Sequence, residues 1–505
     1  MRTTVSATLA ELAGATLAAA PGATQPAQVG PDVVIDARKA TPGSLFVAIP
    51  GEKVDGHDYA SQAAENGATA VIATRQTGAP LAHLLVEESV AGLSRLAHGL
   101  VEQEQRRGLL TLAVTGSSGK TSTKDLLAQL LQQAGPTVSP VGSFNNEIGV
   151  PLTACGVDER TRFLISEMGA RGPGHVAWLC SITRPDVAMV LNVGTAHLGE
   201  FGSREAIAQA KGEIVEALGP EGWGVLNADD PLVAAMAPRC GGRLAWWTRE
   251  DFAATGGTPP PGGLHVRARE VRATALQQYG FQLVVERDGT SSSHPVQLGL
   301  LGSHQVSNAL AAATAAICAG LEPDEVARAL SAATTRSPWR MELVERADGA
   351  AILNDAYNAN PDSMREAVET LGRIGRDRRS EQPGARAIAV LGDMRELGEE
   401  SDALHRELGE LAVRQGIDEV VAVGAWAQQI VAGAREAGGS ARAMERDEVA
   451  AALALGGGDV VLVKASRGIA LEVVAAELAA QVGADLAPAH RHDEESWAPK
   501  PGEAQ

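Results

Sequence analysis

The sequence predicts an α/β protein with three domains, of which the central one is a parallel sheet that carries a phosphate-binding loop. Three observations support this fold class. The chain has 505 residues, which suits about three domains of roughly 150 residues each. Apolar runs without two-residue alternation recur between helical stretches, as is typical of parallel strands buried on both faces. A glycine-rich loop follows one of these runs directly.

Composition excludes several classes of protein. The net charge is −19, and no cluster of Lys and Arg interrupts the acidic balance, which disfavours a protein that grips nucleic acid through phosphates. Hydrophobic residues make up 45% and charged residues 21%, so wholesale disorder and a polytopic membrane protein are both disfavoured. The cysteines lie far apart with no zinc-binding spacing, which predicts reduced core residues of a cytoplasmic protein: Cys155, Cys180, Cys240 and Cys318.

Residues 1–105 are expected to form a small α/β domain without a phosphate loop. Short strand-like runs at 33–35 and 45–49 are separated by Gly and Pro. The Ala-rich run from Leu12 to Pro21 loosely imitates a signal peptide, but Glu11 stands where an apolar core would begin. We therefore expect an ordinary first helix there.

Residues 106–333 are expected to form the central domain. Buried strands are predicted at 109–114, 163–166, 187–192 and 224–227, with helices between them. A segment rich in Gly and Pro at 249–263 precedes a β-rich excursion over 266–300, which we expect to extend the central sheet. The apolar run at 309–321 is shorter than the roughly 18 residues of a membrane span and predicts a buried helix.

Residues 334–486 are expected to form a third α/β domain, and residues 487–505 a disordered tail. Strands are predicted at 351–354, 387–391, 419–423 and 460–463, and the polar stretch from Arg376 to Gly384 predicts a surface loop. The tail is rich in Ala, Pro, His and Glu and shows no periodicity.

The glycine-rich loop predicts an ATP site. It lies between a buried strand and a leucine-rich helix, the context that a phosphate-binding loop requires. Position 114 is Val where the general pattern has Gly, so the loop is a shortened variant. Backbone amides and the helix N-terminus would hold the phosphates, Lys120 would reach the terminal phosphates, and Thr121 would bind Mg²⁺. The nucleotide-binding residues are Gly116, Ser117, Ser118, Gly119, Lys120, Thr121 and Ser122.

Polar residues follow the next two central strands. Glu167 ends one strand, and Asn192 and His197 follow another. Because ligands bind outside the carboxyl ends of parallel strands, these residues are expected to flank the phosphate loop, where Glu167 and His197 can hold a divalent ion. Composition alone makes Lys211 a solvated lysine of the helical run 204–218.

Ordered motifs along the chain resemble the Mur ligase family, the ATP-dependent amide-bond-forming enzymes of peptidoglycan precursor synthesis. The resemblance spans about residues 30 to 475. The discriminating segments are NDAYNANPDSM from Asn354 and LGDMRELG from Leu391. The others are DARKATPGSLFVAIPGEKVDGHD from Asp36, TGSSGKTSTK from Thr115, FNNEIGVPLT from Phe144, NVGTAHLGEFGS from Asn192, LGSHQVSNALAA from Leu301 and VKASRG from Val463.

The resemblance implies an N-terminal domain for a UDP-sugar peptide, a central ATP-binding domain and a C-terminal Rossmann-like domain for the incoming amine. The discriminating segments resemble those of members that add D-alanyl-D-alanine to UDP-N-acetylmuramoyl-tripeptide. The implied reaction transfers the γ-phosphoryl of ATP to the tripeptide carboxylate, and the dipeptide amine then displaces phosphate from the acyl phosphate. We expect a monomer that spans no membrane and binds no nucleic acid.

The resemblance also implies two Mg²⁺ ions and a carbamylated lysine. Thr121 and Glu167 would hold one ion, while His197 and carbamylated Lys211 would hold the second near the acyl oxygen. The catalytic residues on this hypothesis are Lys120, Glu167, His197 and Lys211.

Further binding residues follow from the same resemblance. Asn308 is expected at the adenine, and Arg340 with Asp355 is expected to reach the nucleotide when the C-terminal domain closes. Arg38 is expected at the uridine end, Asn145 and Asn146 at the muramoyl peptide, and Lys464 and Arg467 at the dipeptide carboxylate. The C-terminal side of the cleft would carry Tyr357, Asn358, Asn360 and Ser363.

Two departures from the family pattern stand out. Ala37 replaces a usual Ser, which removes a hydroxyl near the uridine, and Gln305 replaces a usual Asn, which weakens one nucleotide contact.

Two alternative functions stay open at this stage. A sister ligase that adds the third amino acid, or a folylpolyglutamate synthetase, would share the central site. A regulatory or scaffold protein could keep the phosphate loop without turnover. Because both main ligands are anionic, the ligase hypothesis further predicts a positive interdomain cleft built by Arg38, Lys120, Arg340, Lys464 and Arg467.

Overall fold

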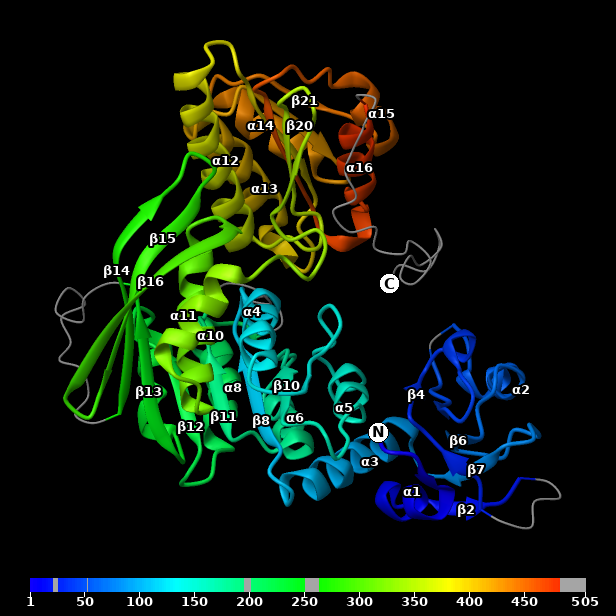
Figure 1. The fold of residues 1–505 in the computed structure, drawn as a ribbon. Helices are drawn as coiled ribbons and strands as arrows, with labels where there is room; N and C mark the ends of the chain where they lie inside the picture. The colour runs from blue at the N-terminus through cyan, green and yellow to red at the C-terminus, as the bar shows by residue number, and fades with distance from the viewer. Residues whose placement is uncertain (21–25, 52, 195–200, 250–262, 482–505) are drawn as a thin grey trace.

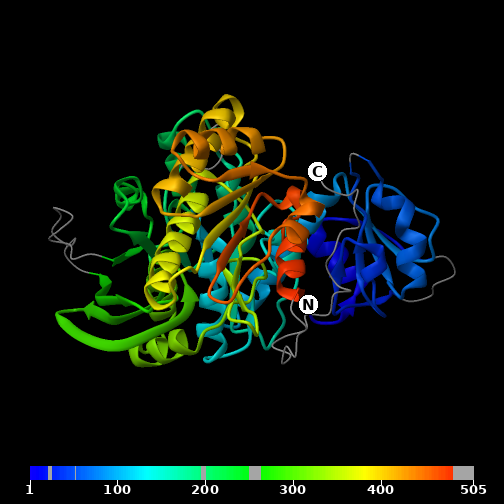
Figure 2. The same ribbon diagram turned by 90° about the horizontal axis from the view of Figure 1, so that it is seen from above.

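The computed structural model describes residues 1–20, 26–51, 53–194, 201–249 and 263–481. Its strands build a two-stranded sheet near the N-terminus and three larger sheets, and we call the parts built on the larger sheets the N-terminal, central and C-terminal units. Figure 1 shows the C-terminal unit above the central unit and the N-terminal unit to one side, and the view from above in Figure 2 agrees. The predicted α/β fold class is confirmed.

The N-terminal sheet has the strand order β2-β7-β6-β5-β4, and β2 runs antiparallel to β7. The predicted first helix is present but does not cover the Ala-rich run at 12–21: it ends at Ala13, and Gly14, whose φ is +60°, turns the chain before strand β2. The elements are β1 (Thr4–Val5), α1 (Ser6–Ala13), β2 (Thr16–Ala18), β3 (Gln28–Val29), β4 (Val33–Val34), β5 (Leu45–Val47), α2 (Ala60–Glu65), β6 (Ala70–Ala73), β7 (Ala82–Leu85) and α3 (Ser89–Gln105).

The central sheet has the strand order β16-β15-β14-β13-β12-β11-β8-β10-β9. Strands β8 to β14 pair in parallel, while β14, β15 and β16 form the antiparallel excursion that the sequence predicts. The strands are β8 (Leu110–Thr115), β9 (Thr137–Val138), β10 (Phe163–Glu167), β11 (Val187–Val190), β12 (Trp223–Asn227), β13 (Arg243–Thr248), β14 (Leu264–Ala273), β15 (Gln278–Arg287) and β16 (Thr290–Leu301).

Helices cover both faces of the central sheet. One apolar core lies between the sheet and α4, α10 and α11, and the other involves α5, α6 and α8. The predicted buried helix at 309–321 lies within α10, most of whose side chains are buried. The helices are α4 (Lys120–Gln132), α5 (Gly149–Ala154), α6 (His175–Thr183), α8 (Arg204–Glu216), α9 (Pro231–Ala234), α10 (His304–Cys318) and α11 (Pro323–Ala332).

The C-terminal sheet has the strand order β17-β18-β22-β19-β20-β21 and is parallel except for β17. The predicted surface loop at 376–384 is wrong for its first part, because α12 continues to Glu381. The elements are β17 (Glu342–Glu345), β18 (Ala351–Asn354), α12 (Pro361–Glu381), β19 (Ala387–Gly392), α13 (Ser401–Arg414), β20 (Glu419–Val423), α14 (Ala427–Glu436), β21 (Ala441–Ala443), α15 (Arg446–Ala452), β22 (Val460–Lys464) and α16 (Glu472–Ala480).

Helix α3 joins the N-terminal unit to the central unit. It packs against α1 on one side and against α5 and α6 on the other, so one apolar core runs through both units. The domain borders expected near 105 and 333 fall close to the ends of α3 and α11, but they stay a prediction. Among the described helices, none combines the length and apolarity that a membrane crossing requires.

Candidate active site

A cavity of about 270 Å³ lies between the central and C-terminal units. It opens at the carboxyl ends of β8, β10 and β11 and of β18 and β22, where parallel sheets bind ligands. Many of the predicted residues line it: Ser117, Ser118, Gly119, Lys120, Thr121, Ser122, Asn145, Glu167, Asn308, Arg340, Asp355, Tyr357, Asn358, Asn360, Ser363 and Lys464.

The phosphate loop turns sharply from β8 into α4. Gly119 has a φ of +78°, and a Cβ there would lie 2.5 Å from Asn308 Oδ1, so both conformation and space require glycine. The first intrahelical bond runs from Thr123 N to Gly119 O. The amides before Thr123 therefore have no intrahelical partner and can bind an anion, supported by the positive end of the helix dipole.

Asn192, just beyond β11, holds the loop in shape. Its Oδ1 accepts hydrogen bonds from the amides of Ser117 (2.9 Å) and Ser118 (3.0 Å). Lys120 Nζ meanwhile donates to the Gly116 carbonyl at 2.6 Å. The sequence pattern predicted that Asn192 lies near the loop. It did not predict that Asn192 holds the loop in shape, because only the fold shows that its side-chain oxygen reaches two loop residues.

Glu167 and Thr121 fit a Mg²⁺ site. Glu167, at the end of β10, is 1% exposed, and its Oε1 accepts a hydrogen bond from Asn145 Nδ2 at 2.9 Å. Its Oε2 is buried without a hydrogen-bond partner among the described residues. Thr121 is 3% exposed and lies in the first turn of the adjacent helix α4. Hard oxygen donors of this kind suit Mg²⁺, which usually keeps several waters and substrate phosphates as further ligands.

The described part of the chain gathers no group of three His, Cys, Asp or Glu side chains that could hold a metal by itself. A Mg²⁺ ion here would therefore depend on the nucleotide for part of its coordination. His197, the predicted ligand of a second ion, lies outside the described residues.

Lys211 is not the solvated lysine that composition alone indicates. It lies in α8 and is only 3% exposed, and burial, together with the charge of Lys120, holds its pKa well below the ordinary value. Burial also lowers the pKa of Lys120; the Arg340 charge adds to this lowering, and Glu167 opposes it. These couplings indicate that Lys211, Lys120 and Arg340 share one electrostatic environment.

The C-terminal unit adds an aromatic and cationic wall. The Arg340 guanidinium lies 4.0 Å from the centroid of the Tyr357 ring. The Tyr357 hydroxyl is hydrogen-bonded to Ser143 Oγ of the central unit, which links the two units beside the cavity. Asp355 is fixed on both sides, because Oδ1 accepts from Met341 N at 3.1 Å and Oδ2 from Lys464 Nζ at 2.6 Å.

Several predicted binding residues are already engaged in intramolecular contacts. Lys464 is 2% exposed and also donates to Asn358 O at 2.8 Å. Arg467 pairs with Glu472, stacks at 4.4 Å on the Trp339 ring and lies outside the cavity lining. Asn360 and Ser363 form the capping box of α12 at the cavity edge.

Arg38 and Asn146 do not line this cavity. Arg38 belongs to a 3₁₀ turn of the N-terminal unit, is bonded to Asp36 and is 66% exposed. The Asn146 side chain accepts from Gly149 N at 2.8 Å and so caps α5. Asn308 lines the cavity, but its Oδ1 accepts from Thr123 Oγ1 and its Nδ2 donates to Gln305. The predicted contacts of these residues with substrates stay predictions.

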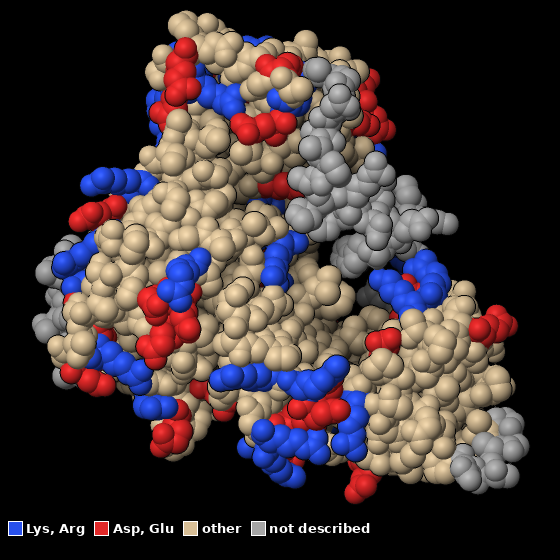
Figure 3. Space-filling view, in the orientation of Figure 1, with Lys and Arg blue, Asp and Glu red and all other residues tan. Residues whose placement is uncertain are grey.

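The cavity carries charges of both signs. Its described lining includes the cations Lys120, Arg249, Arg340 and Lys464 and the carboxylates Glu167, Asp355 and Glu366. Figure 3 shows that charges of both signs are also interspersed on one outer face of the molecule. The predicted positive cleft stays a prediction. Lining residues that the sequence did not indicate include Ser143, Arg249 and Glu366, which no local motif marks.

Three family models match the chain. They are described as "Mur ligase family, catalytic domain" over residues 32–97, "Mur ligase middle domain" over 114–316 and "Mur ligase, glutamate ligase domain" over 339–467. A Mycobacterium tuberculosis protein named UDP-N-acetylmuramoyl-tripeptide–D-alanyl-D-alanine ligase is 42% identical over 488 residues, covering 89% of this chain and 92% of its own. The Escherichia coli protein of that name is 37% identical, covering 78% and 82%.

Solved structures agree with the sequence relatives. A crystal structure of MurF from Acinetobacter baumannii has a TM-score of 0.79 and 28% identity and covers 95% of this chain and 99% of its own. MurF ligase from Thermotoga maritima in complex with ADP has a TM-score of 0.70 and 30% identity, with coverages of 89% and 97%.

Proposed function

The chain belongs to the Mur ligase family, and from this premise we propose that it joins D-alanyl-D-alanine to UDP-N-acetylmuramoyl-tripeptide with ATP, giving the pentapeptide precursor, ADP and phosphate. The observation that carries the proposal is the cavity in which the phosphate loop and Glu167 face Arg340 and Asp355 of the C-terminal unit. Relatives that carry the name of this activity match most of the chain.

The reaction needs two steps, because a carboxylate oxygen is a poor leaving group for an amine. The tripeptide carboxylate attacks the γ-phosphorus of ATP, the bond to the β–γ bridging oxygen breaks, and ADP leaves. The dipeptide amine then attacks the carbonyl carbon of the acyl phosphate. Phosphate departs with the former carboxylate oxygen, and the amine loses its proton as the amide forms.

The residues of the central unit stabilise the charge that moves in the first step. The free amides at the start of α4 would hold the nucleotide phosphates, and Lys120 would move from the Gly116 carbonyl to the transferred group. Thr121 and Glu167 would hold Mg²⁺, which when bound neutralises negative charge on the phosphates. Arg340 would add positive charge from the other side of the cavity.

We further propose that Lys211 is carbamylated and holds a second Mg²⁺ together with His197. A lowered pKa enlarges the neutral fraction of a buried amine, and a neutral amine adds CO₂ to give a carbamate and a proton. The carbamate would replace a buried cation by an anionic oxygen ligand. Lys211→Ala is expected to lose activity and to regain part of it with short carboxylic acids, whereas full activity of the untreated variant would contradict the proposal.

The three units would divide the substrates between them. We assign residues 1–105 to the UDP-muramoyl end with Arg38, 106–333 to ATP with Asn308 near the adenine, and 334–486 to the dipeptide with Lys464. Closure of the C-terminal unit would exclude water from the acyl phosphate. We also propose that the enzyme is a cytoplasmic monomer; all four cysteines are free, which suits a reducing compartment.

Phosphate release tests the proposed function. Release with UDP-muramoyl-tripeptide and ATP should require D-alanyl-D-alanine, and the product mass should equal the pentapeptide precursor. Preference for a single amino acid or for glutamate would identify a sister ligase or a folylpolyglutamate synthetase. No phosphate release with any of these acceptors would favour the regulatory or scaffold protein.

A further inference from the structure

Lys124 is a buried lysine that the proposed reaction leaves without a function. It lies in α4, one helical turn after Lys120, and its side chain is 2% exposed. Its Nζ donates to Asp125 Oδ1 and to the Pro140 carbonyl oxygen at 2.9 Å. Removing a charge from water costs several kcal/mol, and an apolar side chain of similar size could fill the same space. The stability of α4 alone therefore does not account for Lys124.

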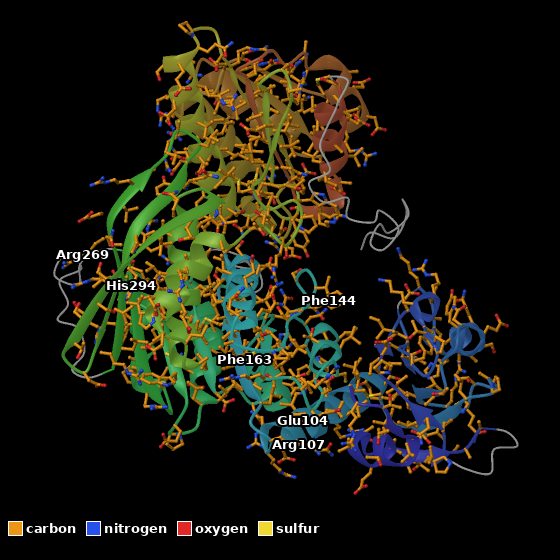
Figure 4. The ribbon with its side chains drawn as sticks, viewed as in Figure 1. Glu104, Arg107, Phe144, Phe163, Arg269 and His294 are labelled. Carbon is orange, nitrogen blue, oxygen red and sulfur yellow. The ribbon has the colours of Figure 1, made fainter. Side chains whose placement is uncertain are left out.

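Pro140 belongs to a segment without regular secondary structure between β9 and α5, which we call the strap (residues 139–146). Its Val141 is 69% exposed. For residues 139–144, the described hydrogen bonds are those from Lys124 to Pro140 and between Ser143 and Tyr357. Figure 4 shows Phe144 of the strap on the side of the central unit that faces the other two units. Residues 139–144 of the strap thus make few hydrogen bonds, of which Lys124 makes one, whereas the Asn145 carbonyl accepts from Gly169 N at 2.8 Å.

The strap carries two groups that belong to the site. Asn145 Nδ2 donates to Glu167 Oε1 at 2.9 Å, which leaves Oε2 without a hydrogen-bond partner among the described residues. Ser143 Oγ is hydrogen-bonded to the hydroxyl of Tyr357 in the C-terminal unit. A displacement of the strap would therefore rotate the carboxylate of Glu167 and separate the two units at this point.

We propose that Lys124 is a positioning residue that holds the strap on the phosphate-loop helix and thereby orients Glu167 through Asn145 and docks Tyr357 through Ser143. The inference rests on the proposed function, since it assigns Glu167 to Mg²⁺. Partners that orient metal ligands typically change metal affinity or activity by about 10–100-fold when they are removed. In this account the buried ion pair fixes the position of the strap. Experiments on some proteins support such a function for buried ion pairs, which hold one conformation against alternatives.

The test removes the ion pair without leaving a buried charge. In the double variant Lys124→Met/Asp125→Leu, kcat is expected to fall about 10-fold or more, and the Mg²⁺ concentration for half-maximal rate is expected to rise by a similar factor. The KM for ATP should change less than about threefold, because the loop amides and Lys120 are untouched. Wild-type kcat and Mg²⁺ dependence in this folded variant would overturn the proposal.

A double-mutant cycle separates positioning from general stability. If Lys124 acts through Asn145, adding Asn145→Ala to the double variant should lower kcat little further, whereas independent effects would multiply and contradict the inference. Arg346→Met/Asp348→Leu removes an ion pair of the C-terminal unit in which Arg346 is 4% and Asp348 28% exposed. This control is expected to lower Tm without changing kcat or the Mg²⁺ requirement.

A second variant covers the case in which the double variant does not fold. Lys124→Gln keeps a hydrogen-bond donor for Asp125 but is one bond too short for Pro140, so it should show the same rise in Mg²⁺ requirement. If wild-type enzyme makes no product from D-alanyl-D-alanine, the proposed function fails. Mg²⁺-dependent ADP binding, measured by calorimetry, still tests Lys124: weaker binding in Lys124→Gln supports it, and unchanged binding refutes it.

Discussion

The central and C-terminal sheets both face the cavity with the carboxyl ends of their parallel strands, which we call the central edge and the C-terminal edge. The two edges differ in whether their charged side chains are paired. At the central edge, Glu167 keeps a buried oxygen without a described partner, and Lys211 is buried and coupled to the charge of Lys120. At the C-terminal edge, Lys464 is paired with Asp355, and Arg467 with Glu472.

The difference indicates a division of labour. Unpaired buried groups cost stability in the free protein and become useful only when a ligand supplies the missing partner. We infer that the central edge is prepared for phosphates and metal, while the paired charges of the C-terminal edge keep a rigid wall that presents Arg340 and Tyr357. We therefore expect substitutions at the C-terminal edge to lower mainly the stability, and substitutions at the central edge to lower mainly the catalytic rate.

The largest effect on stability is expected at the C-terminal edge. Lys464→Met leaves the Asp355 carboxylate unpaired and largely buried, so the free energy of unfolding should fall by about 3–5 kcal/mol. Denaturant unfolding measures this. Adding Asp355→Leu should restore much of the lost stability. A Lys464→Met variant as stable as wild type would contradict the inference that paired charges keep this wall rigid.

At the central edge, the expected loss is catalytic. Glu167→Gln removes a negative oxygen from the Mg²⁺ site, so kcat should fall by about 10²–10³-fold, while the unfolding free energy stays level or rises because a buried charge is gone. Kinetics at varied Mg²⁺ and denaturant unfolding check the two parts.

A matched control for this change is Glu213→Gln. Glu213 is a buried carboxylate of α8 whose oxygens accept from Gly174 N and Ala177 N. Its replacement should lower stability and leave kcat near wild type. If Glu167→Gln destabilised the fold as Glu213→Gln does, the contrast between the two edges would be lost.

The third prediction concerns pH. The folded-state pKa of Lys211 lies well below that of the unfolded chain, so between the two values the unfolded state binds the extra proton. Stability should then rise with pH through this window, by up to about 1.4 kcal/mol per pH unit, and level off above about 10.5. Unfolding in CO₂-free buffer should show this slope relative to Lys211→Met, whereas parallel curves would mean that folding does not lower the pKa of Lys211.

The smallest effect is expected where the edges touch. Tyr357→Phe keeps the ring under Arg340 but removes the hydroxyl that meets Ser143. A hydrogen bond of this kind contributes about 0.5–1.5 kcal/mol, so kcat/KM for the dipeptide should fall roughly 2–10-fold. Ser143→Ala should do the same, and combining both changes should add nothing further.

Local pattern predicted the strands and the phosphate loop well, since buried apolar runs and glycine spacing are local signals. It failed where partners are distant in sequence. No local pattern indicated that Lys464 pairs with Asp355, 109 residues earlier, and the dipeptide contact expected for Lys464 stays a prediction. The arginines after position 376 suggested a loop, whereas Arg378 and Arg379 bond to carbonyls and carboxylates of neighbouring segments and allow α12 to continue. The function of Asn192 could likewise be recognised only in the fold, because the two backbone amides that donate to its side chain follow a different strand.

The central claim is that the tripeptide carboxylate is phosphorylated at the central edge before the amine attacks. UDP-muramoyl-tripeptide labelled with ¹⁸O in its terminal carboxylate tests this most directly, with unlabelled ATP and D-alanyl-D-alanine. The account predicts that each phosphate released carries one ¹⁸O atom from the carboxylate. Pentapeptide formed together with unlabelled phosphate would contradict it.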